Sequence, residues 1–368
     1  FSRMKEKRLI IFMPSIEGGG VEKNLFIISN YLSKKIKNIS LITLSNAYKK
    51  KFNKKIKFNS LKSNYWNSIG RRKKFFISLI ILAMEIFKNR NAIVFCFQGN
   101  IYCTLLCKLL GIKIIVRSNT APEGWSQNII KYFLFRTIFK FANKIVVNSI
   151  DFKKKFKSRF NLDAICIYNP LDKDKIIKKS KKKVNLFFEK KFLNIINVGR
   201  FTDQKDQITL LKGLNLLKKK IRFKLLILGR GIKKKELETY IDNNELNKNV
   251  KIINFQNNPY PYIKSADIFI LSSIYEGLPN VLLESLVLDK FVISTNCPTG
   301  PNEILLNGKG GLLFQPGNYK QLANKIIYYL NNVKKCKKKL KYAQSQLKRF
   351  DYNYNLERYY NLVKSQLY

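Results

Sequence analysis

The chain of 368 residues contains no histidine. Every catalytic Ser-His or Cys-His pair and every histidine-ligated metal site is therefore excluded. Acidic residues are also scarce, because 23 Asp and Glu stand against 71 Lys and Arg and the formal net charge is +48. Three explanations stay open: a lysine-rich compositional bias on solvated faces, attraction to an anionic membrane surface, or nucleic-acid binding. No recognisable nucleic-acid-binding motif accompanies the charge, so no specific nucleic-acid partner is expected.

Two further classes are excluded by the cysteines and the apolar runs. None of the six cysteines has the Cys-x-x-Cys spacing of a metal or redox site, and all are interpreted as reduced residues of a cytosolic protein. The longest apolar run, 75–84, ends at Glu85, well short of the roughly 20 residues that a membrane-spanning helix needs. No signal peptide is recognised and Met4 is the expected natural start, so a cytoplasmic protein is predicted, free or peripheral at the cytoplasmic face of the inner membrane.

Apolar strands followed by helical patterns recur in both halves of the chain, as expected of two doubly wound α/β domains. The expected strands are 9–13, 39–44, 92–97, 112–117 and 144–148, then 193–198, 224–228, 250–254, 268–271 and 291–295. The charged segment 173–191 has no clear period and is interpreted as the linker between the domains. Two long basic helices are expected at about 319–331 and 337–364.

Two carboxylates, Glu276 and Glu284, flank the start of a predicted helix. Pro279 suits the first helical position, so the helix should run from about 279 to 287. One carboxylate precedes the helix and the other lies about a turn and a half inside it, so the two can bind different hydroxyl groups of one elongated ligand. The helix N-terminus between them offers backbone amides to an anion. This combination fits a nucleotide-sugar.

Two loops that join a strand to a helix carry further candidate ligand groups. In Gly-Arg-Phe-Thr-Asp-Gln-Lys (199–205), Arg200 and Lys205 emerge at the carboxyl edge of the second sheet and suit a diphosphate. In Gly-Gly-Gly-Val-Glu (18–22), bare amides can approach a phosphate or sugar, although the Gly-x-Gly-x-x-Gly spacing of a dinucleotide site is missing. A solvated basic loop and a flexible turn are the structural alternatives.

Together these motifs resemble retaining glycosyltransferases of family 4, which have the GT-B fold of two Rossmann-like domains facing a central cleft. Glu-x7-Glu around Gly-Leu-Pro-Asn resembles the donor-binding signature of that family, and 199–205 resembles its Gly-Arg-x4-Lys pattern. The resemblance implies an acceptor-binding domain at 1–172, a linker at 173–191 and a nucleotide-sugar-binding domain at 192–345. It further implies that the terminal helix, 346–368, returns to the first domain.

The resemblance also implies roles for single residues. Glu276 would bind hydroxyl groups of the donor sugar, Glu284 the ribose, and Arg200 with Lys205 the diphosphate, so that Arg200, Lys205 and Glu276 form the catalytic set. Glu303 follows Gly300 in a Gly-Pro-Asn-Glu loop, but local capping or pairing is a second interpretation of its side chain. The implied donor-binding residues are Gly18, Gly19, Gly20, Gly199, Arg200, Lys205, Gly229, Phe255, Glu276, Gly277, Leu278, Pro279, Asn280, Glu284, Gly300 and Glu303.

The acceptor side departs from the resembled family, many of whose members carry a histidine there. The candidates in this chain are Glu22, Arg117, Asn119 and Glu123. The departing diphosphate can take the acceptor's proton in the front-face mechanism proposed for the family. Asp-Lys-Asp (172–174) adjoins the linker and is not expected to bind metal, because Arg200 and Lys205 can replace a divalent ion.

The resemblance therefore implies a retaining, metal-independent glycosyltransferase without a cofactor. It would move a hexose or N-acetylhexosamine from a nucleotide-sugar, with UDP as the expected nucleotide, to a surface-glycan or lipid-linked acceptor. An anionic membrane surface is an expected partner, and the predicted helix 128–143 could rest on a bilayer or pack in the core. A nucleotide-sugar epimerase of the same fold and a basic nucleic-acid-binding protein are the alternatives.

Overall fold

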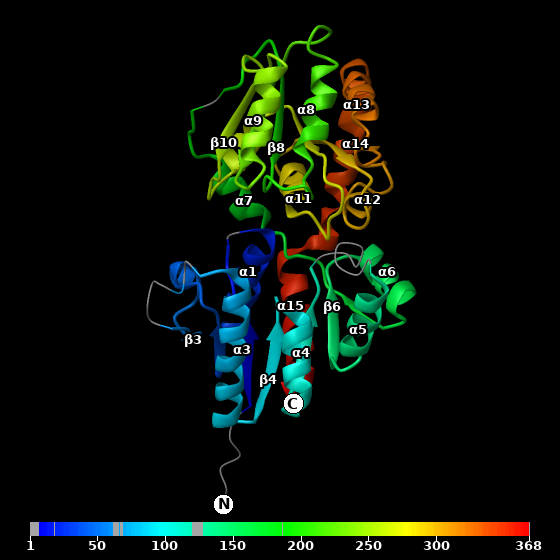
Figure 1. The fold of residues 1–368 in the computed structure, drawn as a ribbon. Helices are drawn as coiled ribbons and strands as arrows, with labels where there is room; N and C mark the ends of the chain where they lie inside the picture. The colour runs from blue at the N-terminus through cyan, green and yellow to red at the C-terminus, as the bar shows by residue number, and fades with distance from the viewer. Residues whose placement is uncertain are drawn as a thin grey trace, which may run out of the picture. The chain divides into compact units, whose positions relative to one another are not determined.

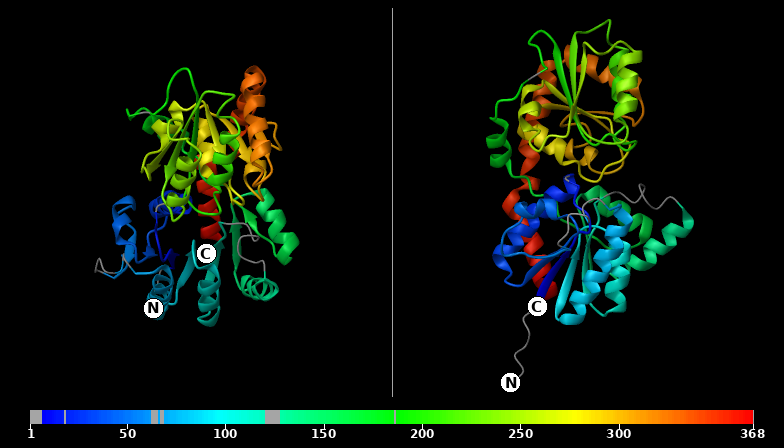
Figure 2. Two further views of the ribbon diagram at one scale, coloured as in Figure 1. Left: turned by 45° about the horizontal axis from the view of Figure 1, so that its top comes forward. Right: turned by 60° about the vertical axis from the view of Figure 1, so that its left-hand side comes forward.

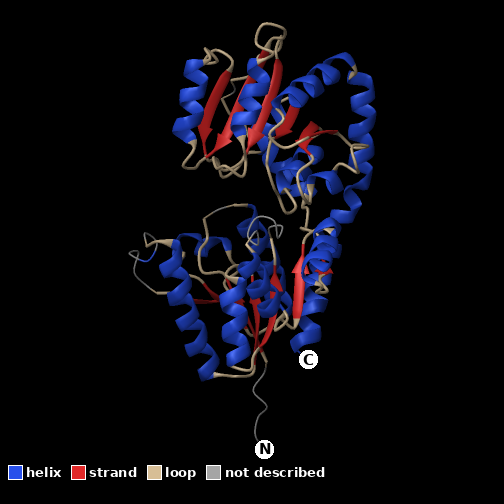
Figure 3. Cartoon of the chain, turned by 45° about the vertical axis from the view of Figure 1, so that its right-hand side comes forward, coloured by secondary structure: helices blue, strands red, loops and turns tan. Residues whose placement is uncertain are grey.

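The computed structural model describes residues 7–17, 19–61, 66, 69–119, 128–185 and 187–367. The chain forms two compact units, one made of Phe1–Pro170 with Tyr352–Tyr368 and the other of Leu171–Asp351. Each unit has a parallel sheet flanked by helices, so the predicted pair of doubly wound α/β domains is confirmed (Figure 1, Figure 3).

The sheet of unit 1 has the strand order β3-β2-β1-β4-β5-β6-β7, with every strand parallel to its neighbours. Its central strands are continuous runs of buried apolar residues, as expected when helices cover both faces. The strands are β1 (Arg8–Phe12), β2 (Ile39–Ile42), β3 (Lys57–Asn59), β4 (Ala92–Cys96), β5 (Lys113–Arg117), β6 (Lys144–Val147) and β7 (Ile165–Cys166). The short strands β3 and β7 were not predicted.

Helices cover the two faces of this sheet unequally. One core cluster joins the sheet to α1 and α15, and the other joins it to the crossover helices α3 to α6 (Figure 2, right). The helical elements are α1 (Gly20–Lys35), η1 (Asn46–Lys51), α3 (Arg71–Lys88), α4 (Asn100–Leu109), α5 (Ile129–Phe139), α6 (Ile150–Phe160) and α15 (Tyr352–Leu367).

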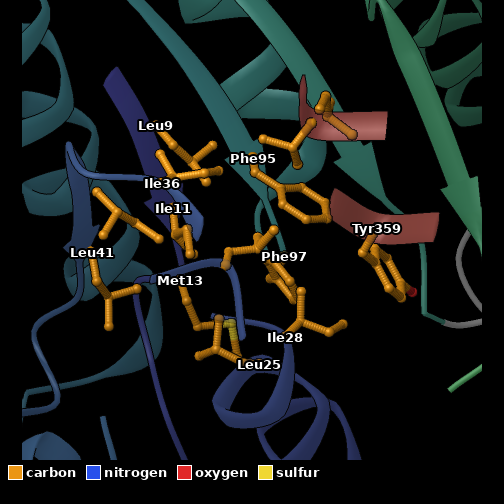
Figure 4. Packing of buried hydrophobic residues seen from close by; sticks show 14 of the residues in the cluster. Leu9, Ile11, Met13, Leu25, Ile28, Ile36, Leu41, Phe95, Phe97 and Tyr359 are labelled. Atoms are coloured by element: carbon orange, nitrogen blue, oxygen red, sulfur yellow. The ribbon is translucent and has the colours of Figure 1, made fainter. Parts of the chain in front are cut away.

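The C-terminal helix α15 is part of the core of unit 1. Its Leu356, Tyr359 and Val363 are fully buried in the cluster that contains Leu9 and Phe95. In Figure 4 the ring of Tyr359 lies beside the ring of Phe95, and the two ring centroids are 6.2 Å apart. The end of the chain therefore completes the unit that its beginning starts.

The sheet of unit 2 has the strand order β10-β9-β8-β11-β12-β13 and is also parallel throughout. Strand order reverses between β8 and β11, and open α/β sheets bind ligands beside such a point, at the carboxyl ends of their strands. The strands are β8 (Leu193–Val198), β9 (Phe223–Gly229), β10 (Val250–Asn254), β11 (Ile268–Leu271), β12 (Phe291–Thr295) and β13 (Leu312–Phe314). The helical elements are α7 (Lys173–Ser180), α8 (Gln207–Asn215), α9 (Lys234–Asn243), α10 (Tyr260–Ser265), α11 (Asn280–Val287), α12 (Pro301–Ile304), α13 (Tyr319–Asn331), α14 (Val333–Ser345) and η3 (Gln346–Phe350).

Two sequence predictions about local structure are corrected. The segment 173–191 begins with helix α7, because the Asp172 side chain caps the Lys175 amide at 3.0 Å and Ile176 is buried on the inner face. The single helix expected at 337–364 is wrong. Helix α14 ends at Ser345, and the chain passes through η3 to Asp351, whose backbone forms a bridge with Leu171 before α15 begins.

No helix within the described ranges is both long enough and apolar enough to cross a bilayer.

Candidate functional site

The residues predicted to bind the donor gather at one edge of the sheet of unit 2. Because the strands of this sheet are parallel, the loops that follow β8, β9, β11 and β12 leave the same edge. These loops carry the predicted residues at 199–205, 229–231, 276–279 and 300. Motifs as far apart as 199 and 300 in the sequence therefore belong to one site.

An ion pair between Lys205 and Glu276 forms the centre of this site. Lys205 Nζ contacts Glu276 Oε1, and the two side chains are only 15% and 8% exposed. Ser273 Oγ donates to the same Oε1 at 2.6 Å. Both donors converge on one oxygen, and no described residue donates a hydrogen bond to Glu276 Oε2. Lys205 Nζ and Glu276 Oε1 are thus in direct contact, while Oε2 keeps its capacity to accept a hydrogen bond.

The loop that carries Glu276 is held by hydrogen bonds to its backbone. Thr299 Oγ1 donates to the Glu276 carbonyl at 2.6 Å, and Gln204 Nε2 donates to the Tyr275 carbonyl at 2.9 Å. Ser272 Oγ in turn donates to the Lys205 carbonyl at 2.9 Å. The loops after β8, β11 and β12 are therefore joined to one another, which fixes the positions of the lysine and the glutamate.

Two glycines of the site are required by close backbone approach. Gly300 has φ of +73° and lies against the Gly277 carbonyl, so a Cβ at this position would overlap the loop of Glu276. A Cβ on Gly229 would overlap the Gly199 carbonyl. These contacts explain the glycines at 229 and 300 as spacers between loops, with the backbones of Gly199 and Gly277 as their close neighbours, whatever ligand the loops bind.

The basic loop after β8 places its two cations differently. Asp206 ends the loop in the left-handed conformation and caps α8, its Oδ1 accepting from the Thr209 amide at 3.3 Å. Burial raises the pKa of this carboxyl, against the hydrogen bonds from Thr209 that lower it. Lys205 points inward to Glu276, whereas the Arg200 side chain is exposed and, among the described residues, donates only to Gln204 Oε1, at 3.3 Å. The structure therefore joins Lys205 and Glu276 directly and leaves Arg200 at the rim.

Helix α11 begins at Asn280 with Pro279 as its N-cap, within one residue of the predicted start. Glu284 lies in the second turn and is only 6% exposed. The Tyr260 hydroxyl donates to Glu284 Oε1 at 3.5 Å. Both glutamates of the motif are therefore buried, one in the loop and one in the helix, and Leu278, which lies between them in the sequence, is 5% exposed.

The loops after β9 and β10 contribute an exposed aromatic and a cation. The Arg230 guanidinium lies 4.7 Å from the ring centroid of Phe255, which is 38% exposed. An accessible ring with a stacked guanidinium is a surface on which a nucleobase can lie.

Cys297 lies beside the central carboxylate. Burial, reinforced by the charge of Glu276, raises the pKa of this thiol to about 12. The thiol is therefore neutral at physiological pH and adds no second negative charge next to Glu276.

Several residues that shape the site were not predicted. Ser273, Gln204, Thr299 and Tyr260 all donate hydrogen bonds to the motif glutamates or their loop. Two of them carried a signal in the sequence, since Gln204 stands within the predicted loop 199–205 and Ser273 belongs to the pair Ser-Ser (272–273) that directly follows the predicted strand 268–271.

The acceptor-side candidates that the structure describes, Glu22, Arg117 and Asn119, lie in unit 1 and are engaged in internal contacts. Arg117 is fully buried, and its guanidinium donates to the Tyr359 hydroxyl at 3.0 Å, to Asn169 Oδ1 at 2.7 Å and to Asn119 Oδ1. It therefore positions Asn119 and helix α15 from within the unit. Glu22 is also buried, and its carboxylate accepts from the Glu17 amide at 3.3 Å.

The remaining residues predicted from the sequence lie in the glycine-rich loop, in helix α12 or outside the described ranges. Gly19 is the N-cap of α1 and Gly20 its first residue, whereas Gly18, Glu123 and Met4 lie outside the described residues. Glu303 lies on α12, and its carbonyl accepts from Arg349 Nη2 at 3.3 Å. In the ranges that the structure describes, no group of three or more cysteine or acidic residues could hold a metal ion.

The chain is similar to one protein-family model, to several glycosyltransferase sequences and to several solved structures. Residues 177–346 match the model of the family glycosyl transferases group 1. The uncharacterised glycosyltransferase MJ1059 of Methanocaldococcus jannaschii is 36% identical over 229 residues, which are 55% of this chain and 55% of that protein. The chain thus spans about half the length of that relative.

A second relative matches along nearly the whole chain. It is the N-acetylgalactosamine-N,N'-diacetylbacillosaminyl-diphospho-undecaprenol 4-alpha-N-acetylgalactosaminyltransferase of Campylobacter jejuni, 27% identical over 94% of this chain and 96% of that protein. Among solved structures, Anabaena Alr3699/HepE in complex with UDP has a TM-score of 0.75 at 16% identity over 98% of this chain and 100% of that chain. Sucrose-phosphate synthase from Thermosynechococcus elongatus has a TM-score of 0.80 at 14% identity over 98% and 99%. At these identities the solved structures show the fold alone.

Proposed function

The chain belongs to the glycosyl transferases group 1 family, which its residues 177–346 match, and has the GT-B fold; from this we propose that it transfers a sugar from a nucleotide-sugar to a lipid-linked glycan. The donor would bind at the carboxyl edge of the sheet of unit 2. The acceptor would be an oligosaccharide carried on a polyprenyl diphosphate, in the assembly of a surface polysaccharide.

The paired Lys205 and Glu276 carry this proposal. A nucleotide-sugar presents a charged diphosphate and neutral sugar hydroxyls within one ligand. Lys205 supplies a positive charge for the diphosphate, and Glu276 Oε2 supplies a hydrogen-bond acceptor for the sugar hydroxyls. Arg200 at the rim adds a second cation for the diphosphate, and Glu284 in α11 provides a carboxylate for the ribose.

The relatives support a particular donor and acceptor. The Campylobacter jejuni protein of 27% identity is named for adding N-acetylgalactosamine to a diphospho-undecaprenol-linked sugar. A second protein of that organism, 26% identical over 97% of this chain, is named for the next such addition. The Anabaena protein of similar fold was solved with UDP. We therefore favour a UDP-linked hexose or N-acetylhexosamine.

The proposed reaction retains the anomeric configuration, in keeping with the resemblance to family 4. The bond from the anomeric carbon to the diphosphate oxygen breaks, and the acceptor oxygen forms its bond on the same face. The acceptor's proton passes to the departing diphosphate, so no protein base is required. Lys205 and Arg200 would stabilise the negative charge that develops on the leaving group, in place of a divalent cation.

The test is transfer by the purified protein with a panel of UDP- and GDP-sugars and an undecaprenyl-diphosphate-linked disaccharide. We expect one UDP-sugar to raise the melting temperature, to release UDP slowly by itself and to extend the acceptor with retention, read by NMR. Epimerised donor in reactions without acceptor would instead indicate an epimerase. Absence of thermal shift and turnover with every donor would contradict the proposal.

Substitutions at the site give the second part of the test. Lys205→Ala, Glu276→Ala and Arg200→Ala should each reduce transfer at least about tenfold, because each removes a group that contacts the developing charge or the sugar. The control is Arg222→Ala, since Arg222 is an exposed arginine that precedes β9 at the opposite edge of the same sheet. Its activity should equal that of the wild type, and turnover unchanged in all three folded site variants would remove their proposed roles.

A further inference from the structure

Helix α3 of unit 1 is apolar on two opposite faces. Its inner face packs Leu82 and Ile86 into the core, where both are fully buried. Its outer face carries Phe76, Ile80, Met84 and Phe87, which are 66%, 46%, 55% and 61% exposed. These positions are spaced by four, four and three residues, so they form one continuous stripe along the helix.

The neighbouring helices continue this surface. On α4, Tyr102, Leu105 and Leu109 are 63%, 41% and 75% exposed at the same helical spacing. On α5, four large apolar side chains are each more than half exposed, namely Ile129, Ile130, Phe133 and Leu134. Helix α4 packs against both α3 and α5, and these helices contribute to the same core cluster on one face of the sheet (Figure 1).

More than half of the large hydrophobic side chains that are exposed among the described residues lie on α3, α4 and α5 or at Phe141. A soluble monomer rarely exposes so many apolar side chains on one face without a partner. The buried faces of the same helices already supply the packing that the fold needs, so the exposed stripes are not part of the core of the unit.

The charges around the stripes are of one sign. Across 69–119 and 128–144, Glu85 is the only acidic residue. It is buried and paired with Arg8 at 3.1 Å and with Lys88 at 3.0 Å, so it adds no free negative charge to the surface. Exposed basic residues border or interrupt the apolar stripes, namely Arg71, Arg72, Lys73, Arg90, Lys108, Lys131 and Lys140.

We propose that this outer face of α3, α4 and α5 docks on the surface of a bilayer that contains anionic lipids. The apolar side chains would enter the boundary between headgroups and acyl chains, while the basic side chains would bind lipid phosphates. The surface suits a bilayer better than a nucleic acid, because a nucleic acid supplies phosphates but no hydrocarbon for the stripes. The inference is independent of the donor site in unit 2.

Vesicle sedimentation tests the proposal with the full-length protein. Wild-type protein should pellet with vesicles of phosphatidylcholine and phosphatidylglycerol, and salt should weaken this binding. The variant Phe76→Ser/Leu109→Ser/Phe133→Ser, one substitution per helix, should lower the partition coefficient at least about tenfold while its circular dichroism stays unchanged. The matched control is Leu216→Ser/Ile232→Ser/Tyr342→Ser, which removes side chains of unit 2 that are 47%, 87% and 44% exposed.

The charge contribution is tested separately. Lys73→Glu/Lys108→Glu/Lys131→Glu should lose binding to vesicles with phosphatidylglycerol, whereas Lys220→Glu/Lys335→Glu/Lys338→Glu in unit 2 changes the net charge equally and should bind as the wild type does. All six lysines are exposed. Equal losses in the two charge variants would mean that total charge, not this face, governs binding, and would overturn the proposal.

Fluorescence locates the inserted face directly. Tryptophan placed at Leu109→Trp should shift to shorter wavelength with vesicles and be quenched by lipids brominated in the acyl chain, whereas Ile232→Trp should show neither effect. Absence of quenching at position 109 would overturn the proposal. So would a lipid-free wild-type dimer that the serine variant converts to monomer, because the face would then be a self-association surface. Binding of a duplex DNA probe that only the Lys73, Lys108 and Lys131 variant loses, with vesicle binding intact, would assign the face to nucleic acid.

Discussion

At the scale of single residues, the central question is whether Lys205 and Glu276 serve the fold or the ligand. Their ion pair is largely shielded from solvent, with the two side chains 15% and 8% exposed. Removing one partner of a buried pair leaves the other charge without compensation, which is more costly than replacing both by neutral groups. Stability and activity therefore respond differently to single and double substitutions.

We expect Lys205→Met to lower the free energy of unfolding by about 3 kcal/mol, because it leaves Glu276 charged and buried. The double variant Lys205→Met/Glu276→Gln should recover most of this loss, since an amide can still accept the hydrogen bond of Ser273, yet transfer should stay at the level of the single variant. Urea denaturation and the transfer assay measure the two quantities.

The exposed pair Lys157 and Asp163 is the control, at 3.0 Å and with side chains 51% and 89% exposed. Lys157→Met should change stability little, as is typical of surface pairs. Recovery of both stability and transfer in the Lys205/Glu276 double variant would show that the pair serves only the fold.

The sequence could predict which residues stand at the strand ends but not where their side chains point. Lys205 and Glu276 were predicted from their motifs, and the structure joins them directly. Arg200 was predicted with them but lies exposed at the rim. Arg117 was predicted as an acceptor-side group, yet it is fully buried because Tyr359, 242 residues away in the sequence, supplies an acceptor inside the unit. No local pattern contains that distant partner.

At the scale of secondary-structure elements, local sequence patterns predicted helix α11 and the central strands close to where the structure has them. Pro279 and the apolar run after it placed the start of α11 within one residue. Helix α7 and the break at Asp351 were missed for a different reason. The start of α7 depends on the cap by Asp172, and the break before α15 depends on the backbone bridge between Leu171 and Asp351. Neither contact leaves a periodic pattern of hydrophobic residues in the sequence.

The contact between α15 and α1 gives a prediction about pH. Glu357 accepts hydrogen bonds from Lys35 Nζ at 2.8 Å and from the Tyr31 hydroxyl, and these lower the pKa of its carboxyl, the bond from Lys35 most. A carboxyl whose pKa is lowered by folding stabilises the fold above its ordinary value of 4.5, and this contribution is lost as the pH falls through the lowered pKa.

Glu357→Gln should therefore lower the urea midpoint of unit 1 at pH 7, and the difference from wild type should shrink as the pH falls below 4.5. Tyr31→Phe removes only the hydroxyl bond and should give a smaller loss with the same pH trend. Urea titrations at several pH values, read by hydrogen exchange in α15, measure both. A difference that grows on acidification would reverse the sign and refute the assignment.

At the scale of the whole molecule, the sequence of unit 2 is inserted between the two segments that form unit 1. Unit 2 is continuous from Leu171 to Asp351, whereas unit 1 is completed by α15. Two doubly wound units could be predicted from the alternation of strands and helices alone. The return of the terminal helix could not, because its buried residues match no particular sheet by pattern; only the family resemblance implied it.

This arrangement predicts that a chain ending at Asp351 keeps unit 2 folded but loses stable unit 1. The truncation removes Leu356, Tyr359 and Val363, all fully buried, from one core cluster. Deleting a single large buried side chain costs about 2–5 kcal/mol, and proteins are typically stable by only about 5–15 kcal/mol, so three such losses consume most or all of that margin. Hydrogen exchange should show protection in β8 and β9 of the truncated chain and fast exchange in β1 and β4.

A pair of point variants in α15 distinguishes the effect of lost core packing from the effect of shortening the chain. Tyr359→Ala removes a buried ring together with the hydroxyl that accepts from Arg117 Nε at 3.0 Å, so it opens a cavity and leaves a fully buried guanidinium short of an acceptor. Tyr354→Ala changes a side chain that is 61% exposed on the same helix. Only the former should lower the melting temperature of unit 1. Equal effects of the two variants, or intact protection of β1 and β4 in the truncated chain, would mean that unit 1 folds without its C-terminal helix.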